Sequence, residues 1–406
     1  MELIIKNYGK YKCIEPLKKG GFSIVYEMLD VVTKNKYAFK VIKSSIFTDM
    51  IKNEYKALKT FKNNSSFLPF YGGAQYKDEF IFRFALAKDD DLKQYIEKYS
   101  LMSENKVKDM LRQLILQIKY AHKHKIIHND IKPENIVLNN GKYYLIDWGV
   151  CQFGENSYYD VSMTDELFVS PEHYNMNIKY ASDIYMLGHV LYYALHGKLL
   201  FGLYRDMPDQ HKMIAHLSKI PKYKSELSQE FINLLNGMLC KNPEKRIDIE
   251  DIEYFLKYNK MKNKKFDILE YPIPKNDFKY ENIYKFYSQC DVKVATFKYA
   301  IELEDKKEYE KSFQIYESLA KKDNSRAMNN LGYIYDAGVG VEINYKKAFY
   351  WYRKASKNNH AMGIYNLALM YEYGKGVEQS IEYAQKLYKM SAKKGYIKAN
   401  KKFVTI

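Results

Sequence analysis

Apolar and polar residues alternate along the first part of the chain with the period of a β-strand. The alternation predicts three strands within residues 11–43 and is clearest in residues 36–43. Residues 50–61 instead repeat their apolar positions at helical spacing, and residues 79–87 form an apolar run suited to one more strand. The opening region is therefore expected to be a small, strand-rich unit with one amphipathic helix.

A helical pattern replaces this alternation from Ser103 onward. Apolar residues return every three or four positions between residues 103 and 125, which predicts a helix that begins at Ser103. Further helices are predicted over residues 183–195, 228–239 and 248–258. Residues 260–280 mix Lys, Asn and Asp with two prolines and have no clear period, which is typical of a linker.

An internal repeat of 36 residues begins near residue 290, where helical segments rich in Ala and Tyr follow one another. A fainter earlier copy has Tyr299, Ser312 and Tyr316 at the same offsets. Repetition at this period indicates helical pairs that bury a core by stacking on their neighbours. The positions that return are Leu331 as Leu367, Tyr335 as Tyr371, Gly338-x-Gly340-Val341 as Gly374-x-Gly376-Val377, Ala348 as Ala384, and Tyr352 as Tyr388.

Composition is that of a folded protein of two or three domains. The chain has 406 residues, of which 47% are hydrophobic and 28% charged. Its four cysteines lie far apart and form no CxxC pair, so we expect a reducing compartment and no zinc or disulfide framework. We see no secretory signal, and no apolar run approaches the roughly 20 residues that span a membrane. We expect a cytoplasmic protein; the nucleus, or delivery into a host cell without a classical signal, remain alternatives.

The net charge of +16 is spread over the whole chain. Residues 1–250 hold 36 Lys and Arg against 30 Asp and Glu, and residues 251–406 hold 29 against 19. The lysines alternate with acids and tyrosines and form no compact basic block, which favours a solvated surface over a nucleic-acid site. We therefore expect no nucleic-acid partner.

The candidate chemistry lies in residues 128–135, which read His-Asn-Asp-Ile-Lys-Pro-Glu-Asn. Phosphoryl transfer needs a carboxylate to orient the attacking hydroxyl, a cation to neutralise the moving group, and oxygen ligands for magnesium. Asp130, Lys132 and Asn135 have the types and spacing for these roles. Asp147, in Asp147-Trp148-Gly149, supplies a second carboxylate for the metal.

These motifs together resemble a eukaryotic-type protein kinase. The resemblance implies an α+β bilobal fold over residues 8–258, with a β-rich first lobe and a mainly helical second lobe, and ATP and Mg²⁺ as cofactors. The repeated pattern resembles Sel1-like repeats, which are related to the tetratricopeptide repeat. It implies a linker at 259–289 and an all-α repeat solenoid at 290–406, with the faint copy at 295–326 and clear copies at 327–360 and 361–400.

The kinase resemblance also assigns further residues. Lys40 would hold the α- and β-phosphates and pair with Glu54, while Phe84 would be the gatekeeper beside the adenine. His128 would brace the metal motif, Asp183 would anchor the catalytic-loop backbone, and Glu172 would pair with Arg246. A metal site at His122, His124 and His128 is the weaker alternative, because no Cys or carboxylate completes it. The expected nucleotide-binding set is Leu17, Gly20, Gly21, Val25, Ala38, Lys40, Glu54, Ala85 and Ala87.

The chain departs from the family pattern in three places. Of the three glycines of the phosphate-binding loop only Gly20 remains, since Lys18 and Ser23 occupy the other positions. Asn129 stands where most kinases have an arginine that binds a phosphate on the activation loop, so we expect activity without activation-loop phosphorylation. Trp148 replaces the usual Phe, as in the casein kinase 2 family, and fills the same apolar slot more tightly.

The leading hypothesis is a serine/threonine kinase whose repeats recruit a protein partner. Lys132-Pro133-Glu134 resembles the catalytic loop of Ser/Thr kinases. The acids Asp89, Asp90, Asp91 and Glu134 suggest substrates with basic residues before the phosphosite; their alternative is simple solvation. Two other functions remain open: a pseudokinase scaffold, favoured by the altered glycine loop and Asn129, and a small-molecule kinase.

Overall fold

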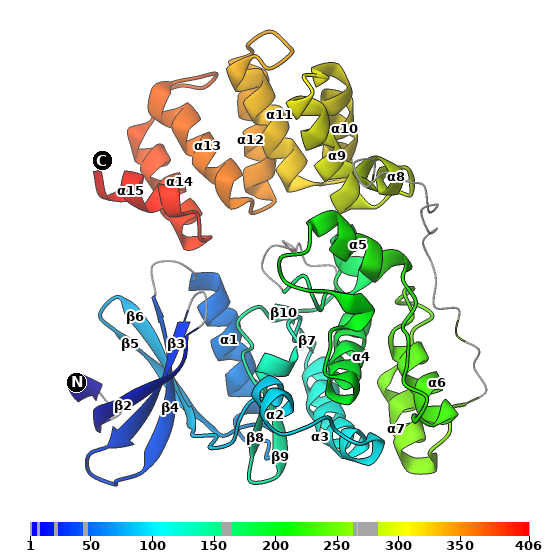
Figure 1. Ribbon diagram of the computed structural model, residues 1–406. Helices are drawn as coiled ribbons and strands as arrows, with labels where there is room; N and C mark the ends of the chain where they lie inside the picture. Colours follow the sequence, from blue (N-terminus) through cyan, green and yellow to red (C-terminus); the bar gives the residue numbers. More distant parts are fainter. Residues whose placement is uncertain are drawn as a thin grey trace. The chain divides into compact units, whose positions relative to one another are not determined.

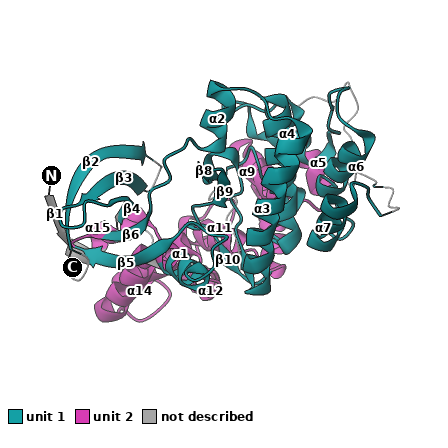
Figure 2. Cartoon of the chain, turned by 90° about the horizontal axis from the view of Figure 1, so that it is seen from below, with its two compact units in different colours: residues 1–42, 52–76, 80–280 teal, residues 43–51, 77–79, 281–406 magenta. Residues whose placement is uncertain are grey.

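The computed structural model describes residues 2–5, 9–19, 23–43, 48–155, 165–262, 266 and 283–405. The chain divides into two compact units, one of residues 1–42, 52–76 and 80–280 and the other of residues 43–51, 77–79 and 281–406 (Figure 2). The larger unit contains a sheet followed by helices, and the smaller contains the helical repeats (Figure 1). Gly20 and Gly21, the activation-segment residues 156–164 and most of the predicted linker lie outside the described residues.

A six-stranded sheet opens the larger unit, with the strand order β1-β2-β3-β4-β6-β5. Strands β2, β3 and β4 pair antiparallel, and their register places Val25 opposite Lys40. One face packs around Tyr11, Met28, Phe39 and Ile81, which explains the apolar alternation. The strands are β1 (Glu2–Ile5), β2 (Gly9–Lys19), β3 (Ser23–Asp30), β4 (Lys36–Lys43), β5 (Phe70–Tyr76) and β6 (Glu79–Ala85), with helix α1 (Thr48–Phe61) between β4 and β5.

The helical part of the larger unit is centred on α3 and α4. Ser103 caps α3 by accepting the Lys106 backbone N–H, as the predicted helix start requires. Nearly every residue of α4 is buried, including Asp183. The elements in chain order are α2 (Leu92–Lys98), α3 (Glu104–Lys123), β7 (Ile126–Ile127), η1 (Pro133–Asn135), β8 (Ile136–Asn139), β9 (Lys142–Leu145), β10 (Gln152–Phe153), η3 (Pro171–Asn175), α4 (Tyr180–His196), η4 (Leu200–Gly202), α5 (Asp209–Ser218), α6 (Gln229–Met238) and α7 (Ile249–Tyr258).

The smaller unit is a series of helices in which neighbours along the chain pack together (Figure 1). Its helices are α8 (Ile283–Gln289), α9 (Lys293–Asp305), α10 (Tyr309–Lys321), α11 (Ser325–Ala337), α12 (Tyr345–Lys357), α13 (Ala361–Tyr373), α14 (Ile381–Lys393) and α15 (Ile397–Thr405). The two clear sequence copies correspond to α11–α12 and α13–α14, and the fainter copy falls on α9–α10. Helix α8 lies inside the segment predicted as linker. A helix of 7 residues is too short to show a period in the sequence, although its tyrosines are buried in the fold.

The repeat period of 36 residues is visible in the core. Tyr316, Tyr352 and Tyr388 occupy equivalent positions and are 0%, 2% and 0% exposed. Helices α11 and α13 both end at a glycine in the left-handed region, Gly338 with φ 72° and Gly374 with φ 65°. Only glycine adopts this conformation without strain, so it stops each first helix at the same place. Tyr335 and Tyr371 are half-buried against the same core.

The expected architecture of a strand-rich lobe, a helical lobe and a helical C-terminal region is confirmed. Within the part of the chain that the structure describes, no helix has both the length and the apolar character needed to cross a membrane.

Candidate active site

Lys40, Glu54 and Asp147 form an ion cluster that joins the sheet to the helical region; Lys40 and Glu54 are buried, and Asp147 is partly exposed. The ammonium of Lys40 on β4 lies 2.6 and 2.9 Å from the two carboxylate oxygens of Glu54 on α1. It lies 2.8 Å from Oδ1 of Asp147, which follows β9. The helical pattern of α1 turns Glu54 inward, and the alternation of β4 places Lys40 on the same side. Three sequence-predicted residues thus meet around one cation.

The pKa values of this cluster keep Lys40 charged. Burial would raise the pKa of Asp147, but the charge and hydrogen bond of Lys40 outweigh it and lower that pKa to about 2. Burial would lower the pKa of Lys40, but the two carboxylates raise it above its ordinary value. Burial raises the pKa of Glu54 despite the opposing effect of Lys40. The cluster therefore holds a cation beside a carboxylate that is ionised at neutral pH.

The Asp147-Trp148-Gly149 motif is held by close packing. The ring of Trp148 is 2% exposed and lies 4.6 Å from that of Phe61 and 4.4 Å from that of His128. A Cβ at Gly149 would stand 3.2 Å from Oδ1 of Asp147 and 3.5 Å from Oε2 of Glu54. Gly149 thus gives the backbone room to pass beside the ion cluster, where a side chain would crowd it.

Asp130, Lys132 and Asn135 converge at the 3-10 turn η1. The Lys132 ammonium lies 3.0 and 2.9 Å from the two carboxylate oxygens of Asp130. Nδ2 of Asn135 donates to the backbone oxygen of Asp130 at 2.9 Å and to its Oδ2 at 2.8 Å. Burial raises the pKa of Asp130 to about 6, although Lys132 opposes the rise. Asp130 is therefore mostly ionised at pH 7 and close enough to its pKa to share a proton.

The backbone that carries Asp130 is fixed by Asp183 of α4. Its two carboxylate oxygens accept the backbone N–H groups of His128 and Asn129, each at 2.9 Å. His122 adds a third bond to this carboxylate at 2.8 Å. Burial would raise the pKa of Asp183, but the His122 hydrogen bond and charge lower it below its ordinary value. An ionised buried carboxylate thus orients the residues just before Asp130.

The three histidines near the catalytic loop have separate partners. His122 contacts Asp183, His124 contacts the Tyr120 carbonyl, and Nε2 of His128 lies 3.0 Å from the Ile146 carbonyl. The part of the chain described by the structure contains no cluster of three or more His, Cys, Asp or Glu side chains that could hold a metal. Each of these histidines therefore contacts a group of the chain itself, and the absence of a metal role stays a prediction.

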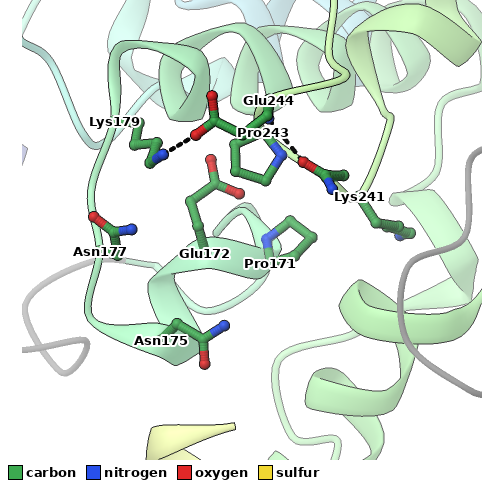
Figure 3. A pocket seen from close by; sticks show the side chains of 9 residues that line it. Pro171, Glu172, Asn175, Asn177, Lys179, Lys241, Pro243 and Glu244 are labelled. Carbon is green, nitrogen blue, oxygen red and sulfur yellow. Dashed lines mark hydrogen bonds and ion pairs between the residues drawn. The ribbon is translucent and has the colours of Figure 1, made fainter. Parts of the chain in front are cut away.

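Glu172 and Arg246 meet in the helical part, as the kinase resemblance implies. A pocket of about 220 Å³ lies beside them, between η3 and residues 241–244 (Figure 3). Lys179 and Glu244 form an ion pair across it. The pocket is lined by none of the predicted catalytic side chains; its lining is Pro171, Glu172, Asn175, Asn177, Lys179, Lys241, Asn242, Pro243 and Glu244.

The predicted nucleotide-binding residues lie on the sheet and the segment after β6. Leu17 on β2 is 44% exposed, and Val25 and Ala38 are partly buried on β3 and β4. The backbone N–H of Ala85 donates to the Pro69 carbonyl at 2.9 Å, so its carbonyl is the group it can offer adenine. Ala87 follows β6 and is partly buried. Phe84, the predicted gatekeeper, packs its ring 5.3 Å from that of Phe70.

Four contacts near the site had no signal in the sequence. Asp165 lies 3.9 Å from the Lys132 ammonium and 3.1 Å from Arg205. His173 donates toward Asn129, and the Lys18 ammonium lies 3.1 Å from a carboxylate oxygen of Asp91. Each contact joins residues at least 33 positions apart, and no local period or motif marks such pairs.

The acids proposed to bind basic substrates already have partners within the chain. Asp91 caps α2 and pairs with Lys18, while Glu134 pairs with Lys93 at 3.0 Å. Asp90 pairs with Lys98 at 3.3 Å, and Asp89 accepts the backbone N–H of Asn140. A substrate arginine would therefore have to displace a lysine from most of these carboxylates.

The chemistry of the donor set suits a hard divalent cation. Asn135 directs its Nδ2 hydrogens to Asp130, which leaves Oδ1 as the atom that can coordinate a metal. Asp147 directs Oδ1 to Lys40, and its side chain is 44% exposed. An amide oxygen and an ionised carboxylate are the ligand types that Mg²⁺ binds. These two residues therefore fit the predicted metal role.

Comparison with known families agrees with this geometry. A family model described as "Protein kinase domain" matches residues 11–254, more than half of the chain. A second, described as "Sel1 repeat", matches residues 325–360 and 361–396. The faint copy at 295–326 lies outside these two matches and stays a prediction.

The relatives found among curated proteins are named as protein kinases. The carbon catabolite-derepressing protein kinase of Candida glabrata is 27% identical over 343 residues, which cover 80% of this chain and 53% of the relative. Its counterpart in Saccharomyces cerevisiae is 27% identical, over 80% of this chain and 52% of the relative. The serine/threonine-protein kinase cds1 of Schizosaccharomyces pombe is 29% identical, over 60% of this chain and 57% of the relative. The chain thus spans little more than half the length of these relatives.

Proposed function

Because the chain belongs to the protein kinase family, we propose that it transfers the γ-phosphoryl group of ATP to serine or threonine side chains of proteins, with Mg²⁺ as the metal. The observation that carries this proposal is the convergence of Lys132 and Asn135 on Asp130, with Lys40 joined to both Glu54 and Asp147. A phosphoryl-transfer site requires this combination of an orienting carboxylate, cations and metal ligands.

Each side chain has a defined task in the proposed reaction. Asp130 accepts a hydrogen bond from the substrate hydroxyl and orients its oxygen toward the phosphorus. Lys132 gives up part of its hydrogen bonding to Asp130 and neutralises the charge of the transferring phosphoryl group. Lys40 binds the α- and β-phosphates, and Glu54 holds the Lys40 side chain in place. Asn135 and Asp147 are the metal-binding residues. Magnesium, when bound, neutralises phosphate charge.

The preference for serine and threonine rests on Lys132-Pro133-Glu134 and on the names of the relatives. A further preference for basic residues before the phosphosite rests on Asp89, Asp90, Asp91 and Glu134, and it is weakened by the partners that these acids already have within the chain. A peptide array would test it. If phosphorylation of the peptides does not increase when arginine precedes the acceptor residue, the preference for basic residues is excluded.

The repeats are proposed to recruit a protein partner. Their surface carries several exposed aromatic residues, among them Tyr333, Tyr350 and Tyr373, which are 55%, 50% and 60% exposed. Tyrosine is enriched in protein interfaces because it combines apolar area with a polar hydroxyl. The proposed location is the cytoplasm, which the free state of the four cysteines favours. Imaging of the tagged full chain tests the location.

The test of the activity is transfer of label from ATP in the presence of Mg²⁺. A generic basic protein and the chain itself serve as acceptors, and phosphoamino-acid analysis identifies the acceptor residue. We expect transfer by the wild type and by Asp109→Asn, whose carboxylate is 66% exposed on α3, and loss of transfer in Asp130→Asn. Transfer that persists in Asp130→Asn would contradict the assigned role.

The alternative of a pseudokinase scaffold predicts a different outcome. The wild type would then transfer no label, while Mg²⁺ and ATP would raise its melting temperature or leave it unchanged. The comparisons give this alternative no support, since the relatives are named as kinases.

A further inference from the structure

Asn129 lies at the centre of a buried hydrogen-bond network next to the catalytic aspartate. Its side chain is 0% exposed and its backbone has φ 68°, a left-handed conformation that asparagine tolerates better than most residues. Its backbone N–H is bound by Asp183. Nδ2 donates to the Val150 carbonyl at 3.5 Å, a contact that orients the amide, and Oδ1 lies 2.9 Å from Nε2 of His173.

His173 has one tautomer that satisfies its neighbours. Its Nδ1 accepts the backbone N–H of Ser170 at 3.2 Å and lies 2.7 Å from the Ser170 hydroxyl. The ring proton must therefore sit on Nε2, where it is donated to Oδ1 of Asn129. Burial lowers the pKa of His173 to about 4, so the ring is neutral at physiological pH.

The network joins three segments that must be aligned for catalysis. Ser170 lies near the end of the activation segment, residues 147–172, and His173 directly follows its last residue, Glu172, which pairs with Arg246. Asn129 precedes Asp130, and Val150 directly follows the Asp147-Trp148-Gly149 motif. Ser170, His173 and Asn129 are all 0% exposed, so water does not compete for these bonds.

We propose that His173 is a positioning residue, which holds the activation segment on the catalytic loop through Asn129 and makes phosphorylation of that segment unnecessary. This rests on the proposed phosphoryl-transfer function. An arginine beside the catalytic aspartate needs an anion, and a phosphate supplies it. The Asn129–His173 pair is neutral and closes without one, so the link is already made in the unmodified chain.

The proposal is tested with substitutions that separate the hydrogen bond from the volume of the ring. His173→Phe keeps a ring but removes the N–H donor, and His173→Gln keeps an amide N–H that can reach Asn129. Asn129→Ala removes the acceptor from the other side. His124→Phe is the matched control, because that histidine is exposed and lies at the end of α3. Each full-length variant is treated with phosphatase before measurement.

Two readouts are taken from every variant. Hydrogen exchange of residues 165–175 reports how firmly the segment is held, and steady-state kinetics separates kcat from the KM for ATP. We expect His173→Phe and Asn129→Ala to exchange faster and to lose about tenfold in kcat, with the KM for ATP within about twofold. His173→Gln should regain most of the exchange protection and most of kcat. The double variant His173→Phe with Asn129→Ala should lose no more than either single variant, and His124→Phe should match the wild type.

The outcomes distinguish the positioning role of His173 from the proposed phosphoryl-transfer function. Exchange and kcat of His173→Phe equal to the wild type, or no recovery in His173→Gln, would overturn the positioning role. Phosphatase treatment that abolishes wild-type activity would overturn it as well. If the wild type transfers no phosphate at all, the proposed function fails, while the exchange of residues 165–175 still decides whether His173 holds the segment. If His173→Phe does not fold, Asn129→Ala carries the same comparison.

Discussion

Arg246 donates from two guanidinium nitrogens to the two carboxylate oxygens of Glu172, at 2.6 and 2.9 Å, and both side chains are buried. The guanidinium also donates to the carbonyls of Cys240 and Ala181, at 2.9 and 2.7 Å. Burial would raise the pKa of Glu172, but Arg246 outweighs it and lowers the pKa to about 2. One ion pair thus fastens the end of the activation segment to the start of α4 and to the loop before α7.

Removal of one partner should therefore destabilise the larger unit severely. We expect Arg246→Leu to lower its free energy of unfolding by about 3–5 kcal/mol, because Glu172 is left as a buried, unpaired charge. The double change Glu172→Leu with Arg246→Leu should recover part of the loss. Denaturant unfolding followed by Trp148 fluorescence measures this in a Trp351→Phe background, since Trp351 is the other tryptophan and lies in α12. A single variant as stable as the parent would contradict the expectation.

Lys40→Met should lower kcat/KM by about a hundredfold or more, because it removes the cation between Glu54 and Asp147. The matched control is Lys36→Met on the same strand, because the Lys36 ammonium pairs with Glu27 and the side chain is 51% exposed. This control should stay within about twofold of the wild type. Equal losses in the two variants would indicate that damage to β4, and not the ion cluster, reduces the rate.

Asp130→Asn should make the protein more stable while it abolishes transfer. The pKa of Asp130 is raised to about 6 in the folded state, so ionisation at neutral pH opposes folding. At pH 7.5 the gain should be up to about 3 kcal/mol in the free energy of unfolding, and it should shrink as the pH falls below 6. Melting curves at several pH values test this. A destabilised Asp130→Asn variant would show that the bond from Lys132 outweighs burial.

Mild acid should destabilise the larger unit through its buried histidines. Burial lowers the pKa of His173 to about 4 and that of His216 to about 3, while the pKa of His189 is also well below its ordinary value. The unfolded chain binds protons below about pH 6.5 and the folded chain does not, so stability falls as the pH drops from 6.5 toward 4. His173 and His216 should each account for about 2 kcal/mol at pH 5, and Asp130 partly offsets them.

Unfolding between pH 7.5 and 5 measures this loss. A His216→Asn variant should have a shallower pH dependence, because one buried imidazole no longer titrates. A dependence as steep as that of the parent would exclude His216 as a contributor. The comparison is independent of catalysis and can be made on the full chain.

The parts of the fold predicted well from the sequence were those with a local signal. The alternation in residues 36–43, the helical spacing after Ser103 and the period of 36 residues each reflect which side of an element is buried. The candidate site could be assembled because its residues stand in contiguous motifs. Lys40 and Glu54, 14 positions apart, were paired only through the family resemblance.

The remainder depends on contacts that tertiary packing creates. His173 lies 44 positions from Asn129, and nothing in its surroundings in the sequence marks it as a partner. Asp165 contacts Lys132 from 33 positions away, and the acids at 90, 91 and 134 have lysine partners that composition alone does not assign. Helix α8 is too short for a period to identify it.

The tyrosines at 316, 352 and 388 are spaced by one full repeat, and each occupies the equivalent buried position in its own repeat. A gene segment that encodes 36 residues can therefore be duplicated or lost by unequal recombination without disturbing the junctions on either side. An insertion of one residue would instead turn the following part of a helix by about 100° and bring its tyrosine out of the core. The helices of the array can therefore change in number by whole repeats while the buried tyrosines keep their places.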